Sequence, residues 1–373
     1  MARVSIATGG TTLTTRKCLS RISLRLSGLV NADDTLTEMP SVPQTIFAIP
    51  LRGLTWIGDQ GTRAVAAVVF IAVAVPPIGA LLRPYLTVAI VCLLCISFMR
   101  VDLAALYGHL RRPGLVAAAT AWTTLGVPLI VGLIAWATGF DNHSPGLFLG
   151  LMLQGMASPM MASPALAAMM GLDATLVLIT LVTSTALVPF TASLFAGLFL
   201  GAKLSVTPLA LGLKLLGLLA GSLLGATIIR RVVGAEAIQR HKRPIDGINI
   251  IILLAFASAI MGDVAHDVLT DPIFTIGVAL MAFAIYFALL AVTTLIFRRV
   301  GYERALALGL MVSQRNLGLM LAATSGALPA TTWLYFALTQ FPLHLAPYML
   351  TPIARRLMAS DDGPGTAAAS NPT

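Results

Sequence analysis

Long apolar runs alternate with short polar segments between residues 60 and 357 of the chain. About 20 consecutive apolar residues are enough to cross the ~30 Å hydrocarbon core of a membrane as a helix. By run length we predict about ten spans, and the expected fold class is an all-α polytopic membrane protein. The predicted spans cover residues 64–82, 85–99, 114–138, 146–170, 174–200, 207–229, 245–261, 273–297, 305–325 and 330–353.

The fourth and ninth runs are interrupted by proline or polar residues. Ten spans divide into five plus five, and a repeated half with an odd number of spans must be inverted in the membrane. The fourth and ninth runs then hold equivalent positions in the two halves. Paired interrupted helices mark the midplane site of many transporters. We therefore predict a ten-helix domain at residues 61–357, with repeats at about 61–203 and 207–357 and helices 4 and 9 crossing.

The composition agrees with this reading, because 57% of the residues are hydrophobic and only 10% are charged. A soluble domain carries about 25% charged residues, and the mean hydropathy here is +0.90. The net charge of +9 does not indicate nucleic-acid binding, because the basic residues lie in short loops between apolar runs. In that position they set membrane topology.

Positive charge predicts the orientation of the chain. Basic residues follow the second, sixth, eighth and tenth runs: Arg100, Arg111, Arg112, Arg230, Arg231, Arg240, Lys242, Arg243, Arg298, Arg299, Arg304, Arg355 and Arg356. The opposite loops carry Asp141, Asp263, Asp267 and Asp271, with Arg83 and Lys203. We expect a multi-pass protein of the cell (inner) membrane with both termini in the cytoplasm.

The two ends of the chain differ from the apolar part. Residues 1–60 are expected to be a partly disordered cytoplasmic extension, with an interfacial segment at residues 47–57 that carries Trp56. Residues 1–27 are rich in Ser, Thr and Arg, so a transit peptide is one alternative, and a true start near Met39 is another. Residues 358–373 are expected to be a disordered cytoplasmic tail.

The ninth run contains the polar cluster Ser313, Gln314, Arg315 and Asn316. Arg315 lies about 15 Å into the predicted span, where an arginine costs roughly 2.5–3.5 kcal/mol on insertion scales. No Asp or Glu lies within any predicted span at this depth. Arg315 could therefore bind an external anion bidentately. The alternative is a structural role, in which it bridges carbonyls of the fourth span.

The fourth run contains the unit Met-Ala-Ser-Pro twice, at residues 156–159 and 161–164. Pro159 and Pro164 remove backbone donors and disfavour helix at Ser158 and Ser163. The carbonyls released in this way must be satisfied by protein, water or ligand. Gln154 precedes this interruption. The alternative is a pair of proline kinks in which Ser or Thr hydroxyls donate to the released carbonyls.

Three further features are weaker candidates for a functional role. Thr123, which precedes Pro128, is an outer candidate for the site, although hydroxyls in helices often satisfy their own i−4 carbonyl. His344 is the one candidate proton carrier, because imidazole titrates near neutral pH, and a structural histidine is the alternative. Cys92 and Cys95 form a C-x-x-C inside an apolar run, which favours small buried residues over a metal or redox site.

Signatures of enzymes and of ATP-driven transport are missing from the sequence. It contains no H-E-x-x-H, no G-x-S-x-G and no P-loop. We therefore expect no enzymatic activity and no ATP-driven mechanism within this chain.

Several motifs resemble those of the bile acid:sodium symporter family, over roughly residues 60–357. They are the run at residues 96–113 followed by a span with Pro128, the sequence Ala162-Ser163-Pro164 followed by Asp173 and a Thr/Ser-rich span ending in Pro189, and the motif Arg315-Asn316-Leu317-Gly318. The resemblance implies an inverted five-plus-five repeat with a panel domain and a core domain. It also implies that organic anions bind where spans four and nine cross, and that they are carried with sodium.

The chain departs from the sodium-coupled pattern of that family at several positions. Pro164, Met311, Arg315, Thr123, Val177 and Leu181 stand where the resemblance implies oxygen-bearing sodium ligands. Arg315 adds a positive charge that would repel a nearby cation. The resemblance therefore supports the fold more than the sodium coupling, and a sodium ion is the only cofactor that it implies. The Cys and Glu of arsenite-exporting relatives are also missing.

The resulting hypothesis is a secondary transporter of a small organic anion. Its substrate-binding candidates are Arg315, Gln314, Asn316, Ser313, Ser158, Ser163, Gln154 and Thr123. The alternatives are a sodium-coupled symporter of such anions and a membrane sensor that binds an anion without moving it. The expected partners are the anion and the lipid bilayer, with no nucleic acid. The substrate, direction, coupling ion and oligomeric state stay open at this point.

Overall fold

A computed structural model of the chain describes residues 44–100 and 113–361. Every element within these residues is helical, and the one isolated β-bridge among them joins Pro159 to Arg315. The all-α class is therefore confirmed for the described part. The chain divides into two compact units, Met1–Arg52 and Gly53–Thr373. The predicted N-terminal extension and C-terminal tail fall mostly outside the described residues, while the expected interfacial segment lies within helix α2 (Gln44–Asp59).

Six described helical stretches are long and apolar enough to cross a membrane, or seven when one bent pair counts as a single span. They indicate a multi-pass membrane protein. The helices next to interruptions are too short for this criterion, as α10 (Pro145–Met156) shows with its 12 residues. The ten-span inverted repeat therefore stays a prediction.

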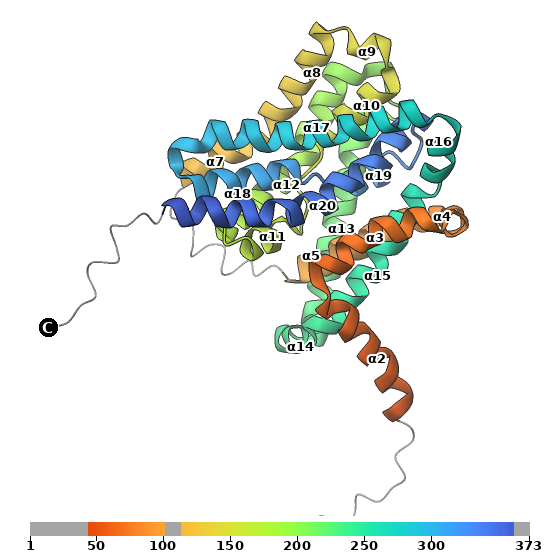
Figure 1. Cartoon of the computed structure of the whole chain (residues 1–373), viewed down its shortest axis with the longest axis vertical. Coiled ribbons are helices and arrows are strands. Elements are labelled where there is room, and N and C mark those ends of the chain that lie inside the picture. The colour runs from red at the N-terminus through yellow and green to blue at the C-terminus, as the bar shows by residue number, and fades with distance from the viewer. Residues whose placement is uncertain (1–43, 101–112, 362–373) are drawn as a thin grey trace, which may run out of the picture. The chain divides into compact units, whose positions relative to one another are not determined.

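Each predicted span nevertheless corresponds to helix in the structure (Figure 1). In chain order these helices are α3 (Gly61–Ala74), α4 (Pro76–Leu82), α5 (Leu86–Arg100), α7 (Pro113–Ala121), α8 (Val127–Ala137), α10, α11 (Ser163–Met169), α12 (Ala174–Phe195), α13 (Pro208–Val233), α15 (Lys242–Met261), α17 (Pro272–Phe297), α18 (Tyr302–Ser313), α19 (Leu317–Ala323) and α20 (Ala330–Asp361). The short helices α9 (Phe140–His143), α14 (Ala235–Arg240) and α16 (Val264–Thr270) lie in the connections.

The first predicted span, expected as one helix over residues 64–82, is divided at Val75 into α3 and α4. Val75 has φ −128° and ψ 69°, outside the helical region. The cause is Pro76, which disfavours helical torsions in the residue before it and lacks an N–H of its own. The helix restarts with Pro76 at its first position, where the missing donor costs nothing.

Side-chain caps explain where three of the long helices begin. Asp173 accepts from the Leu176 N–H at the start of α12, and Asp271 accepts from the Phe274 N–H at the start of α17. Thr207 does the same for α13. In α13 and α17 a proline follows the cap, and its fixed φ suits the first helical turn.

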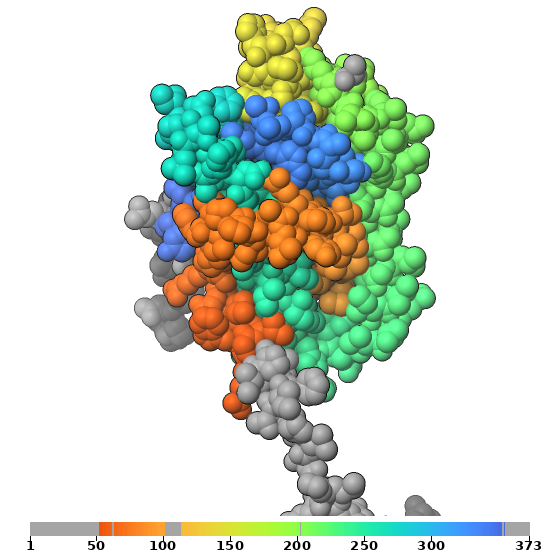
Figure 2. Space-filling view, turned by 90° about the vertical axis from the view of Figure 1, so that its right-hand side faces the viewer, coloured from red at the N-terminus to blue at the C-terminus, as the bar shows by residue number. Residues whose placement is uncertain are grey.

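The helices from residue 53 onward pack in two sets. Helices α3, α4 and α5 each pack against α15, and α13 lies against α5. Figure 2 shows this face, with the orange residues of α3 to α5 next to the green residues of α13. The second set contains α7, α8, α10, α11, α12, α17, α18, α19 and α20. Contacts of α13 with α12 and α19, of α5 with α19, and of α3 and α15 with α20 join the sets.

Among the described residues, five ion pairs connect segments that the predicted topology assigns to the same side. Arg83 pairs with Asp263 and Lys203 pairs with Asp141, all expected opposite the cytoplasm. The three pairs on the expected cytoplasmic side are Arg100–Asp246, Arg243–Asp59 and Arg304–Asp173. The pairing is consistent with the alternation of loops, while the orientation itself stays a prediction.

Candidate functional site

The interruption of the fourth predicted span lies between α10 and α11. Helix α10 ends at Met156, and Ala157 adopts an extended conformation with φ −64° and ψ 150°. Helical structure resumes only at Ser163. The two Ser-Pro pairs account for the gap, because a residue before proline favours extended torsions and a proline donates no backbone hydrogen bond.

The interruption of the ninth span is shorter and lies between α18 and α19. Gln314 and Asn316 leave the helical region, with ψ 87° and ψ 77° respectively. The Asn316 Oδ1 accepts from the Leu319 N–H at 3.1 Å and so caps α19. A polar side chain that bonds to a nearby backbone N–H thus stabilises the break in the helix.

The two interruptions cross and hydrogen-bond to each other. The Met160 N–H donates to the Gln314 carbonyl at 2.7 Å, and the Asn316 N–H donates to the Ser158 carbonyl at 2.8 Å. These bonds flank the antiparallel bridge between Pro159 and Arg315. The crossing of the two interrupted helices is therefore as predicted. Each unwound segment supplies partners for backbone groups that the other leaves free.

Arg315 lies at the centre of this crossing and is 1% exposed. Its Nη1 donates to the Ala157 carbonyl at 2.8 Å. Nη1 and Nη2 both lie 3.4 Å from the Thr123 carbonyl, as longer bonds. No carboxylate pairs with Arg315 among the described residues, and its Nε has no partner there. The bond to Ala157 has the geometry of the structural alternative, in which Arg315 bridges carbonyls of the fourth span.

Thr123 contributes its backbone rather than its hydroxyl. The Thr123 Oγ1 donates to the Ala119 carbonyl at 2.7 Å, in the usual i−4 manner. A π-helical turn at Trp122–Gly126 leads the Val127 N–H to the Trp122 carbonyl. The next residue, Pro128, has no N–H to donate. The Thr123 carbonyl is left without either backbone donor and is open to Arg315.

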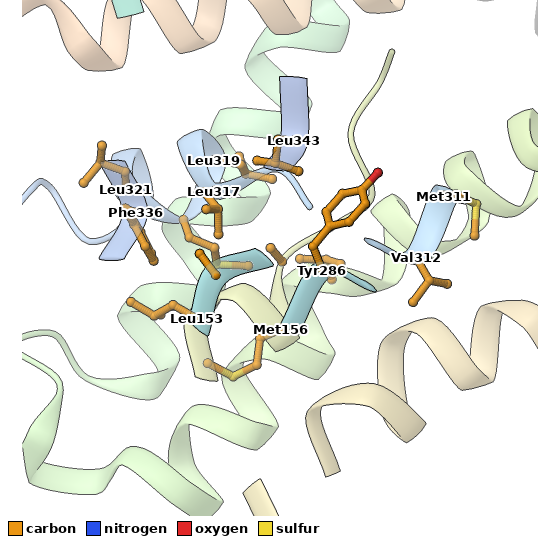
Figure 3. Packing of buried hydrophobic residues seen from close by; sticks show 14 of the residues in the cluster. Leu153, Met156, Tyr286, Met311, Val312, Leu317, Leu319, Leu321, Phe336 and Leu343 are labelled. Carbon is orange, nitrogen blue, oxygen red and sulfur yellow. The ribbon is translucent and has the colours of Figure 1, made fainter. Parts of the chain in front are cut away.

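The two glutamines of the predicted site are both held by tyrosines. The Tyr335 hydroxyl donates to the Gln154 Oε1. The Gln314 Nε2 donates to the Tyr286 hydroxyl at 2.9 Å and to the Leu343 carbonyl at 3.0 Å. That carbonyl is available because Pro347, four residues later in α20, carries no N–H. Figure 3 shows Tyr286 and Leu343 in the buried cluster with residues of α10, α18 and α19.

The remaining predicted residues are buried at or near the crossing. The Ser313 Oγ donates to the Leu310 carbonyl, while Ser158 Oγ and Ser163 Oγ have no partner among the described residues. His344 Nδ1 lies 2.7 Å from the Gln340 carbonyl. Because a carbonyl only accepts, Nδ1 carries a proton, and Nε2 has no hydrogen-bond partner among the described residues. The proton-carrier role of His344 stays a prediction.

A cavity of about 140 Å³ lies against one side of the crossing. Its apolar wall comes mainly from α3, α5 and α15 of the first helix set, and its other wall includes the two interruptions. The lining residues are Val65, Ile90, Leu93, Leu94, Ser97, Met160, Met161, Ala162, Asn249, Leu253, Phe256, Arg315, Asn316, Leu317, Gly318, Gln340 and Leu343. Arg315 is the only charged residue in this set.

Two of the predicted binding residues, Arg315 and Asn316, line this cavity. The others, Gln314, Ser313, Ser158, Ser163, Gln154 and Thr123, are not part of its lining, and their role in binding stays a prediction. Sequence reasoning missed Ser97, Asn249 and Gln340 as lining residues. Ser97 and Asn249 are each a single polar residue within an apolar run. Asn249 follows Asp246 by three residues, which is about one helical turn. This spacing places the two polar side chains on the same helix face and could have drawn attention to Asn249.

Gly318 brings the start of α19 close to the first helix set. A Cβ at this position would lie 2.9 Å from Phe256 Cζ and 3.4 Å from Ile90 Cγ1. A larger residue here would therefore require the Phe256 ring to shift, whereas glycine leaves it in place. This gives a packing reason for the glycine in the Arg-Asn-Leu-Gly motif.

The described residues contain no cluster of three or more His, Cys, Asp or Glu side chains able to hold a metal ion. Cys92 and Cys95 are free thiols in α5, and the Cys95 thiol donates to the Ser222 carbonyl. No family model matches the chain, and no curated protein matches it at a significant level.

Proposed function

We propose that the chain is a secondary transporter that carries a small organic anion across the cell membrane. The observation that supports this function best is the cavity beside the crossing of the two interruptions. Among the described residues that line it, Arg315 is the only charged one, and none of them is a carboxylate that could neutralise it.

The sign of the charge selects the ligand class. In a site of low dielectric constant an unneutralised guanidinium attracts an anion far more strongly than it does in water. The polar lining residues Ser97, Asn249, Asn316 and Gln340 add groups that can bond to anion oxygens. The apolar remainder of the lining suits a small carbon skeleton, which favours an organic anion over an inorganic one.

The position of the cavity favours transport over simple binding. It lies between two sets of helices, so a rocking motion of one set against the other could expose it to either side. The ten-span topology with an inverted repeat, both termini in the cytoplasm and the resemblance to bile acid:sodium symporters are parts of the same proposal. The same-side ion pairs support it.

Uptake into proteoliposomes tests the proposal. We expect saturable accumulation of at least one labelled anion from a panel of acetate, pyruvate, benzoate, succinate, sulfate and phosphate, compared with protein-free liposomes. Each anion is assayed with sodium and with choline as the external cation. Saturable binding to the purified protein without accumulation would indicate the anion sensor instead. If the protein neither binds nor takes up any of these anions, the proposed function is contradicted.

A further inference from the structure

The hydrogen bonds of the Arg315 guanidinium all go to backbone carbonyls, within the described residues. The acceptors are Ala157 in the unwound segment after α10 and Thr123 in the π-helical turn before α8. Arg315 itself lies in the unwound segment between α18 and α19. Three irregular segments from distant parts of the sequence thus meet at one positive charge.

The two acceptor carbonyls are free for separate local reasons. Ala157 follows the end of α10 in an extended conformation, with ψ 150°, so its carbonyl lies outside the helical hydrogen-bond ladder. Thr123 loses the Val127 N–H to Trp122, and Pro128 offers none. Neither carbonyl could regain a helical partner without refolding its segment. In a membrane both would otherwise be buried polar atoms without partners, which is costly.

Carbonyls exposed by unwound helices inside a membrane are ligands for small cations. We propose that Arg315 is a tethered cation. Its guanidinium fills a carbonyl site, made by Thr123 and Ala157, that would otherwise require a soluble monovalent cation. The crossing then carries its own positive charge.

The tethered cation bears on whether transport of the anion needs a coupling ion, and in that respect the inference rests on the proposed function. If the cation is part of the chain, assembly of the crossing needs no sodium, and uptake of the anion is independent of sodium. The positive charge also stays in place when the anion leaves. The stability of the crossing, in contrast, can be tested without any anion.

The experiment compares thermal unfolding of purified wild type and Arg315→Ala in detergent, with no organic anion present. We expect the Arg315→Ala variant to have a lower unfolding temperature. Added guanidinium, kept far below denaturing concentrations, is expected to restore part of this loss in a saturable way. Choline at the same ionic strength, which cannot donate N–H bonds to the carbonyls, is expected to have no effect.

Two controls make the result specific. Tyr335→Phe removes a buried hydroxyl that bonds to Gln154 rather than a cation, so guanidinium should not restore that variant. Arg315→Lys keeps a tethered charge and should need no added cation. If Arg315→Ala cannot be purified, the same guanidinium titration is applied to Arg315→Gln, which keeps hydrogen-bond donors without the charge.

Failure of guanidinium to stabilise the Arg315 variants, or a sodium-dependent unfolding temperature in the wild type, would overturn the tethered-cation inference. Sodium-dependent uptake by the wild type would overturn it as well, while leaving the proposed transport intact. Guanidinium could raise the unfolding temperature of the Arg315 variants while the wild type takes up no anion. That result would support the tethered cation and contradict the proposed function. The two proposals can therefore fail separately.

Discussion

The two interruptions reach the same crossing by different chemistry. Between α10 and α11 the helix is broken by prolines, which subtract donors and release carbonyls. Between α18 and α19 it is broken by polar residues, which add local partners such as the Asn316 cap. One segment therefore has surplus acceptors, and the other brings the buried donors of Arg315. The two segments therefore complement each other in hydrogen-bond donors and acceptors, and neither should keep its unwound conformation without the other.

The largest effect is expected for Arg315→Met, which keeps an unbranched side chain but removes every donor. The Ala157 and Thr123 carbonyls would lose their hydrogen-bond donor. A buried polar group without a partner lowers the unfolding free energy by about 1–3 kcal/mol. This exceeds the gain from no longer burying a charge, because the proline-broken segment cannot restore its own hydrogen bonds. Thermal unfolding in detergent measures the loss. A variant as stable as the wild type would show that the segments do not depend on each other.

The next largest effect distinguishes the two glutamines. Tyr335→Phe removes the only partner described for the Gln154 side chain, whereas Tyr286→Phe leaves Gln314 bonded to the Leu343 carbonyl. We expect Tyr335→Phe to lower the unfolding free energy by about 1–2 kcal/mol and Tyr286→Phe to lower it by less. Parallel unfolding measurements compare them. The reverse order would mean that the second bond of Gln314 contributes nothing.

A smaller effect is expected at the cap of α19. Asn316→Ala should lower the unfolding free energy by about 1 kcal/mol, because the Leu319 N–H loses its acceptor. Asn316→Asp keeps an acceptor oxygen at the same position and serves as the matched variant in the same unfolding assay. Equal losses in both variants would indicate that the amide donor of Asn316, rather than its capping oxygen, is the important group.

The smallest effect is expected for Pro159→Ala. The residue lies opposite Arg315 in the crossing, where bonds from Met160 and Asn316 already hold the segment extended. Restoring an N–H should not close the helix, and the loss should stay near ~0.4–1 kcal/mol, mainly through the unfolded state. Circular dichroism and thermal unfolding check this. An increase in helical content would show that the proline alone maintains the interruption.

Much of the helical pattern could be predicted, because an apolar run of membrane length has few other ways to satisfy its backbone. The interruptions at Pro159 and at residues 313–316 were predicted for the same reason, since prolines and polar clusters leave a direct mark on the sequence. The division at Val75 was missed, although Pro76 and Pro77 were visible in the predicted span.

The candidate site was predicted less completely. Arg315 and Asn316 line the cavity, as expected from a charge buried in an apolar run. The acceptor role of the Thr123 carbonyl was not foreseen, because it depends on a π-helical turn that no residue type marks. Tyr286 and Tyr335 were also missed, since a tyrosine in an apolar helix does not reveal its partner. Such contacts are set by packing between distant helices.

The most direct test of the proposed site fills the cavity without touching Arg315. Gly318→Leu places a side chain against Phe256 and Ile90, whereas Gly221→Ala adds a methyl group in α13 where no atom lies within 4 Å. Binding of the panel anions to both purified variants and to the wild type is measured by the rise in unfolding temperature. We expect binding to be lost in Gly318→Leu and kept in Gly221→Ala. Equal binding in the two variants would contradict an anion site at this crossing.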